Sequence, residues 1–415
     1  MASRDDTVPI DYGLPVELAA SSAEAVAAQA FAERRMTSYV GRLRTIVNED
    51  TGADCPEGRE RVAAQLAEWA EQAGCECDLF STEGGSHFVA RLPGSGRGRV
   101  VLLGHHDTVF EHGTAATRPF SEKGGRALGP GVADMKGGLL VGLLALEALA
   151  TGERPFEAVE LHSAPDEEVR TTALPTLDRL RGALAVLVFE CGRENGDLVV
   201  GRKAGAWARL AVRGHPAHAG TEPERGQSAV LGLCRELLRI DSLNQRRPGL
   251  TIVAGTFSGG TMANVVPERA EAVLDVRAAS ANDLNWALHE IAAASLDAGL
   301  ETSITVDGPW PGIEPNPGTA EMFAEAERLA AAMGTRLGGQ TSGGVSDGSW
   351  TADAGLPTLD GLGPVGGRDH SADEYILLRS VPVRCGLTVG LCDALGRGLL
   401  CCQRLPEGGG LKGIV

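Results

Sequence analysis

Short strand-like runs alternate with helix-like segments in the first half of the sequence, and this alternation constrains the fold more than any other feature. The runs cover residues 99–104 (RVVLLG), 159–163 and 184–189 (LAVLVF). Such short runs, rich in branched apolar residues, are typical of strands that are buried on both faces. Helix-like patterns cover Pro56 to Ala73, with Gly74 as the stop, and Lys136 to Ala150. Together these patterns predict an α/β fold with a mainly parallel sheet flanked by helices.

A different pattern begins near Ala206 and indicates a second domain. The order of its predicted elements is β-α-β-β-α-β, which is typical of a small α+β two-layer sandwich. These elements cover residues 207–212, 228–240, 250–258, 271–277, 282–298 and 302–306, and a proline-rich crossing follows at 308–318. A chain of 415 residues also exceeds the ~250–300 residues at which one core stops growing. We therefore predict a discontinuous catalytic domain (1–203 and 315–415) and an inserted lid or dimerisation domain (204–314).

The charge and the cysteines restrict the partners and the location that can be expected. The formal net charge is −17, which argues against nucleic acid or an anionic membrane surface as a partner. The sequence contains no apolar run of about 18 residues and no secretory signal pattern at its start. Its nine cysteines have neither disulfide-framework nor zinc-ribbon spacing. We therefore expect reduced thiols and a cytoplasmic protein.

Polar residues follow the first strand-like run at the point where it ends. His105 and Asp107 lie two positions apart, so in an extended segment both side chains point to the same side. Asp107 could then orient the imidazole of His105, an arrangement common around metal-bound histidines. A surface histidine followed by a helix-capping aspartate explains the same residues equally well.

Other acidic residues and a histidine occupy comparable positions. Asp134 lies in a glycine-rich turn before a helix, where an ordinary helix cap is an equally good explanation. Glu167 and Glu168 follow the second run, and a solvated acidic loop would be the simpler interpretation of this pair alone. Glu190 ends the third run and His370 lies in a loop. Taken together, two histidines and three carboxylates suit two zinc ions about 3.5–4 Å apart, with one bridging carboxylate.

The motifs around these residues resemble those of the M20-type family of dinuclear zinc peptidases and deacylases. The resemblance is strongest to the glutamate carboxypeptidase branch of that family, the carboxypeptidase G2-like members. The similarity extends from about Thr37 to Leu400. The motifs, in chain order, are GHHDTV (104–109), GPGVADMKGG (129–138), PDEE (165–168), FE (189–190), GHPAHAG (214–220), ANVVP (263–267), DVR (275–277) and RDHSADE (368–374).

The resemblance implies a role for each metal-site residue. His105 and Glu190 would bind one Zn²⁺, Glu168 and His370 would bind the other, and Asp134 would bridge them, with Co²⁺ or Mn²⁺ as possible substitutes. Asp107 would orient His105. Glu167 would be the general base that takes a proton from the attacking water and returns it to the leaving amine.

The resemblance also implies substrate contacts. His218 would stabilise the oxyanion in the partner's active site of a homodimer formed through the inserted domain, and Asn264 and Arg277 would contact the substrate. Arg277 could pair with a carboxylate through its planar fork, and the loop with Gly343 and Gly344 could supply backbone donors.

One position departs from the family pattern and bears on the substrate. Trp310 stands where carboxypeptidase G2 has a substrate-binding arginine, so an aromatic side chain could line a more apolar pocket. The expected substrate is a small amide that bears a carboxylate. The expected enzyme is a carboxypeptidase or, alternatively, an N-acyl-amino-acid deacylase. A catalytically inactive relative used for binding is disfavoured because Glu167 and every ligand are present.

Overall fold

A six-stranded sheet lies at the centre of the main part of the protein, in a computed structural model that describes residues 16–293 and 299–400. In sheet order, the strands are β1 (Glu76–Thr82), β2 (Gly85–Pro93), β6 (Ala158–Ala164), β3 (Arg99–His105), β7 (Ala185–Val188) and β14 (Thr358–Leu359). The last four pair in parallel, whereas β1 and β2 form an antiparallel edge. The predicted α/β class with a mainly parallel sheet is confirmed. The predictions about the N-terminus and about the tail after Cys402 lie outside the described residues.

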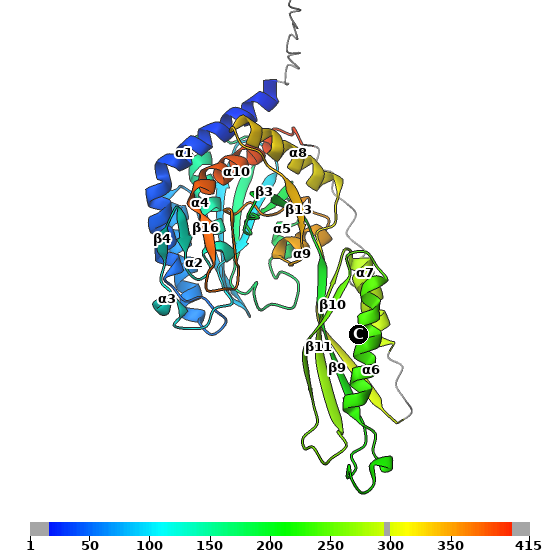
Figure 1. The fold of residues 1–415 in the computed structure, drawn as a ribbon. Coiled ribbons are helices and arrows are strands. Elements are labelled where there is room, and N and C mark those ends of the chain that lie inside the picture. Colours follow the sequence, from blue (N-terminus) through cyan, green and yellow to red (C-terminus); the bar gives the residue numbers. More distant parts are fainter. Residues whose placement is uncertain (1–15, 294–298, 401–415) are drawn as a thin grey trace, which may run out of the picture.

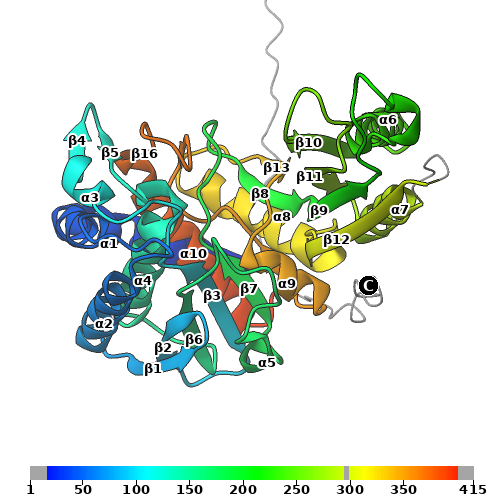
Figure 2. The same cartoon turned by 90° about the horizontal axis from the view of Figure 1, so that it is seen from below.

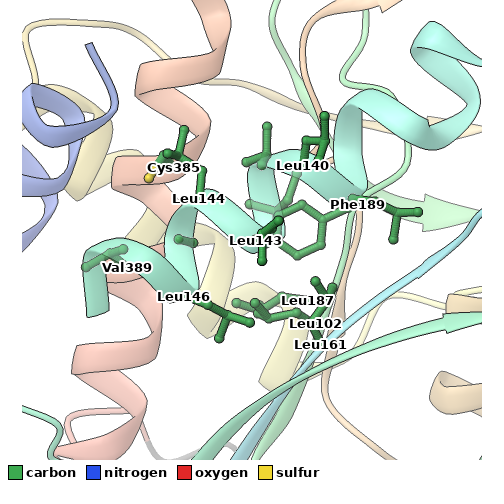
Figure 3. Close-up of a cluster of buried hydrophobic side chains, with 14 of the residues drawn as sticks. Leu102, Leu140, Leu143, Leu144, Leu146, Leu161, Leu187, Phe189, Cys385 and Val389 are labelled. Atoms are coloured by element: carbon green, nitrogen blue, oxygen red, sulfur yellow. The ribbon is translucent and has the colours of Figure 1, made fainter. Parts of the chain in front are cut away.

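Helices cover both faces of this sheet, because alternate residues of each central strand point to opposite sides. One face packs against α4 (Gly137–Leu149), with α1 (Val16–Val47), α8 (Pro317–Ala332) and α10 (Val381–Gly396) around it (Figures 1 and 2). Leu102, Leu161 and Leu187 point from the strands toward the leucines of α4 (Figure 3). Val101 and Leu103 belong to a smaller core on the other face, under α5 (Leu177–Leu180) and α9 (Asp347–Asp353).

The predicted helices occur with slightly different ends. Helix α2 (Pro56–Gln72) packs on β1 and β2, and the chain leaves it through Gly74, whose φ of 86° is in the left-handed region that glycine favours. Helix α4 begins at Gly137, one residue later than predicted, because an irregular turn (Val132–Lys136), whose backbone is not helical at Asp134 and Met135, precedes it. That turn carries Asp134.

A separate four-stranded unit projects from the main part (Figure 1). We call residues 204–310 the inserted unit. Its elements are β9 (Ala204–Arg213), α6 (Ala229–Asp241), β10 (Thr251–Gly259), β11 (Arg269–Ala278), α7 (Ala281–Ala292) and β12 (Glu301–Trp310). The strand order is β10-β11-β9-β12, every neighbouring pair is antiparallel, and the two helices pack on one face over a core of their own. The predicted order of elements is therefore confirmed, whereas the domain boundaries at 203/204 and 314/315 stay a prediction.

Two details of the inserted unit differ from the sequence prediction. The helix predicted to reach residue 298 ends at Ala292, and residues 294–298 lie outside the described ranges. Strand β12 extends to Trp310, where a proline-rich crossing had been expected from Gly308 onward. The strand continues because Trp310 still pairs with Gly205 of β9 after an irregularity in register.

A small antiparallel sheet brings two loops of the main part together. It consists of β4 (Ser121–Lys123), β5 (Arg126–Leu128), β16 (Tyr375–Leu377) and β15 (Gly366–Gly367). Tyr375 pairs with Leu128, so the loop before β16 lies beside the turn that follows β5. These segments carry His370 and Asp134. The other short elements are α3 (Thr114–Thr117) and the parallel pair β8 (Leu198–Arg202) and β13 (Gly339–Ser342).

Among the described residues, no helix has both the length and the apolar character needed to cross a membrane.

Candidate metal centre and substrate pocket

The predicted metal ligands converge at the carboxyl edge of the parallel strands, which is where open α/β sheets bind ligands. His105 is the last residue of β3, Glu168 lies in the loop after β6, and Glu190 follows β7. Asp134 and His370 come from the two loops that the small sheet holds together. His370 has a φ of 60°, which is uncommon for a residue other than glycine. Residues with such backbone conformations occur often at functional sites.

The first group of possible ligands consists of His105, Asp134 and Glu190. The Nε2 atom of His105 lies 3.1 Å from Oδ1 of Asp134 and 3.7 Å from Oε1 of Glu190. One ligand atom of each residue lies within 4.8 Å of the others, so a single cation could contact all three.

The second group consists of Asp134, Glu168 and His370, and it shares Asp134 with the first. The Nε2 atom of His370 lies 3.2 Å from Oδ2 of Asp134 and 3.3 Å from Oε2 of Glu168. The two oxygens of Asp134 therefore face different histidines. This is the arrangement expected of a carboxylate that bridges two cations.

The chemistry of this cluster fits a pair of divalent cations. Burial is the largest cause that raises the pKa values of Glu167, Glu168 and Glu190, and neighbouring carboxylates raise them further. Oε1 of Glu168 is buried and has no hydrogen-bond partner among the described residues. Bound cations would offset the free-energy cost of burying these carboxylates close to one another. Imidazole nitrogens together with carboxylate oxygens are a ligand set that suits zinc.

Asp107 connects the two sides of the site. Its Oδ1 lies 3.3 Å from Nδ1 of His105 and accepts a hydrogen bond of 3.1 Å from the backbone N–H of Glu167. Its Oδ2 accepts one of 2.9 Å from the backbone N–H of Glu168. The predicted contact with His105 is present, and Asp107 also fixes the backbone of the acidic loop.

Glu374 holds the turn that carries Asp134, a role that no sequence motif predicted. It is 1% exposed, and its carboxylate accepts hydrogen bonds from the backbone N–H groups of Gly131 (3.0 Å), Ala133 (2.7 Å) and Asp134 (3.0 Å). Because its partners are backbone groups far away in the sequence, side-chain spacing contains no signal for this role.

A cavity of about 590 Å³ opens beside the cluster, with walls from both parts of the protein. Arg277 contributes to it from β11, and Asp275 holds Nε and one terminal nitrogen of the guanidinium through two bonds of 2.9 Å. Nη1 of Arg277 is buried and has no partner among the described residues. Gly344 lines this cavity, whereas Gly343 does not. The N–H of Gly344 already donates to Ser342 Oγ, which leaves the expected role of both glycines as backbone donors a prediction.

The structure does not bring His218 and Asn264 into this cavity within one chain. They lie together elsewhere in the inserted unit, where the backbone N–H of Ala219 donates to the carbonyl of Asn264. The exposed ring of His218 accepts hydrogen bonds from Gly220 N and Thr221 N, both 3.1 Å long. Their predicted contacts with substrate remain a prediction.

Two arginines in the lining of the cavity form buried ion pairs that no sequence pattern predicted. Arg170 pairs with Asp166 and Asp347, and Arg202 pairs with Asp360. Both arginines line the cavity. Arg170 and Asp166 are four residues apart in the sequence. The other two pairs join segments that are far apart in the sequence and that only the tertiary fold brings together.

Comparison with known proteins places these features in a family. A family model described as peptidase family M20/M25/M40 matches residues 101–393. The chain belongs to this family. It is therefore a hydrolytic enzyme, and the membership that its motifs predicted is confirmed.

Individual relatives are distant in sequence but similar over most of their length. The chain is 27% identical to carboxypeptidase G2 of Pseudomonas sp. (strain RS-16) over 373 residues, which cover 87% of this chain and 90% of the relative. It is 27% identical to acetylornithine deacetylase of Proteus mirabilis (strain HI4320) over 304 residues, which cover 67% and 77%. The fold matches the crystal structure of aminopeptidase PepT from Bacillus cereus ATCC 10987 with a TM-score of 0.75 at 22% identity, covering 87% of this chain and 98% of that one.

Proposed function

We propose that this protein is a dinuclear zinc hydrolase that cleaves an amide bond next to a free carboxylate, as a carboxypeptidase of the glutamate carboxypeptidase type. The observation that carries the proposal is the shared Asp134, whose two oxygens face His105 and His370 in two separate ligand groups. The similarity to carboxypeptidase G2 over 87% of the chain supports the carboxypeptidase class.

Each residue of the centre has a separate task in this reaction. His105 and Glu190 would hold one Zn²⁺, Glu168 and His370 the other, and Asp134 both. When bound, zinc polarises an amide carbonyl and makes water a better nucleophile at neutral pH. Glu167 takes a proton from the attacking water and delivers it to the nitrogen that leaves. Asp107 keeps Glu167 in place through its backbone N–H.

The substrate is positioned from the inserted unit. Arg277 lines the cavity, and its guanidinium, whose Nη1 has no partner among the described residues, can donate to the carboxylate next to the scissile amide. His218, which lies outside this cavity, would act in the partner subunit of a homodimer, as its oxyanion donor. Asn264 lies beside it and would act there as well.

An N-acyl-amino-acid deacylase is the second candidate, because it cleaves the same bond and differs mainly in the acyl group. Trp310, which lines the cavity and stands where carboxypeptidase G2 has a substrate-binding arginine, favours an apolar substrate group over a second carboxylate at that position. We also propose a cytoplasmic location without nucleic-acid or membrane partners, which the unpaired state of the described cysteines and the charge of −17 support.

The test combines a general-base variant with a substrate panel. Glu167→Ala should keep the fold and the zinc content while kcat falls at least ~100-fold on N-acyl amino acids and dipeptides. Glu157→Ala, at a surface position whose side chain is 56% exposed, serves as the control. Normal turnover by Glu167→Ala would contradict the mechanism, and preferred cleavage of dipeptides or of acetylated amino acids separates the two candidates.

A further inference from the structure

The tryptophans of this protein gather at the cavity. The sequence contains five tryptophans, and three of them, Trp207, Trp310 and Trp350, line the cavity beside the metal ligands. Aromatic residues make up only 4% of the chain, so this concentration at one site distinguishes it from the remaining surface. Large aromatic side chains around a ligand site supply apolar contact area and geometric selectivity for rings.

Trp207 and Trp310 form a fixed pair on the sheet of the inserted unit. Their ring centroids are 5.2 Å apart and the ring planes meet at 73°, an edge-to-face arrangement. The indole N–H of Trp207 donates to Asp275 Oδ2 (3.1 Å), and that of Trp310 donates to the carbonyl of Arg170 (3.3 Å). Because both polar atoms are already bonded within the protein, the pair can offer only carbon surface to a ligand. Trp207 still exposes 42% of its surface.

The free nitrogen of Arg277 lies beside this pair. Across the sheet, Gly205 of β9 has Trp310 as its neighbour on one side and Arg277 on the other. A Cβ atom at Gly205 would lie 2.9 Å from Nη1 of Arg277, so the glycine leaves room for the guanidinium. Asp275, which anchors Trp207, is also the residue that holds Arg277. One face of the sheet therefore presents a hydrogen-bond donor for a carboxylate and an aromatic surface together.

A ligand that uses both features carries a carboxylate and an apolar group in one small fragment, and an aromatic ring suits two indole rings best. We propose that the amine released by the reaction is an aromatic α-amino acid, with its carboxylate on Arg277 and its ring against Trp207 and Trp310. This inference rests on the proposed amide hydrolysis. In that reaction, water adds across the C–N bond, the acyl carbon takes the hydroxyl, and the amino group of the aromatic amino acid takes the proton.

The test keeps the acyl group constant and varies the amino acid. The zinc-loaded enzyme is assayed with the N-acetyl and glycyl derivatives of phenylalanine, tyrosine, leucine, alanine, glutamate and arginine. We expect kcat/KM for the aromatic members to exceed that for alanine by about 10- to 100-fold. A preference for leucine, alanine, glutamate or arginine would overturn the inference, whereas absence of turnover with every member would contradict the proposed function instead.

Variants connect the preference to the tryptophan pair. Trp310→Leu and Trp207→Leu should lower kcat/KM for the phenylalanine derivatives about 10-fold, mainly through KM, and change kcat/KM for the alanine derivatives less than about 3-fold. Trp286→Leu is the matched control, because Trp286 lies on α7 outside the cavity, beneath Arg246 and Arg247. Equal losses for all substrates would contradict the inference.

Binding of the free product gives a measurement that depends neither on turnover nor on the variants. Free phenylalanine should raise the melting temperature of the wild-type enzyme and inhibit it at concentrations at least ~10-fold lower than free alanine. Equal effects of the two amino acids would overturn the inference even if the variants fail to fold.

Discussion

Glu374 provides the most informative perturbation outside the proposed metal ligands themselves. In Glu374→Ala, the backbone N–H groups of Gly131, Ala133 and Asp134 lose their acceptor in a buried position. Each unsatisfied buried donor costs about 1–3 kcal/mol, and water that enters the space left by the side chain recovers part of this. We therefore expect the free energy of unfolding to fall by roughly 3–6 kcal/mol.

Glu374→Gln separates the loss of charge from the loss of the acceptor. Oε1 of Glu374 accepts from Ala133 and Asp134, so a glutamine can keep these two bonds with its carbonyl oxygen. Its NH₂ group then faces the N–H of Gly131, a donor against a donor. The loss should be smaller than for alanine, about 1–3 kcal/mol.

The assay has two readouts. Urea unfolding of the metal-free protein reports on the turn itself, and zinc competition with a chelator reports on Asp134. Removing a residue that orients a ligand typically weakens metal affinity 10- to 100-fold, and we expect that range for Glu374→Ala. Glu157→Ala is the control and should stay within about 0.5 kcal/mol of wild type. If Glu374→Ala matched this control in both readouts, the role of Glu374 in holding the turn would be refuted.

Three further predictions concern other parts of the protein. Mixing the inactive variants His218→Ala and Glu167→Ala should restore part of the activity if His218 acts across a dimer, and no recovery would place the complete site within one chain. Arg277→Lys should raise KM for carboxylate substrates about 10-fold with little change in kcat, because lysine lacks the fork held by Asp275; an unchanged KM would contradict the carboxylate contact. Burial lowers the pKa of His87 to about 4 from 6.5, so the unfolded chain binds a proton between these values that the folded chain does not. Acidification from pH 7 to 5 should therefore cost wild type about 2 kcal/mol more stability than His87→Asn, and equal pH dependence would refute this assignment.

The central strands could be predicted because their burial is visible in their composition. Residues 100–105 of β3 are buried along the whole run, and such strands contain few polar residues. The edge strand β1 was not predicted, because most of its side chains are exposed and several are charged or polar. The inserted unit could be predicted from the alternation of apolar and polar residues in β9 and β11. Every second residue of these strands faces the core of the unit.

The convergence of the proposed ligand residues could be predicted for a related reason. Polar residues that directly follow buried strands must gather at one edge of a parallel sheet, and the family resemblance supplied the residues on loops. Glu374 and the ion pair between Arg170 and Asp347 could not be predicted, since their partners are set by the tertiary fold. Trp310 does line the cavity, as its place in the family pattern suggested, but the strand extension and the contact with Arg170 that hold it there could not be predicted.

Metal content measured together with activity tests the proposed two-metal centre. Wild-type protein should bind two zinc ions per chain, lose its amide hydrolysis on removal of both, and regain it when zinc is added back. Asp134→Ala should bind less than one ion per chain, because Asp134 belongs to both ligand groups. Full activity in protein with only trace zinc, cobalt or manganese, or two tightly bound ions in Asp134→Ala, would contradict the account.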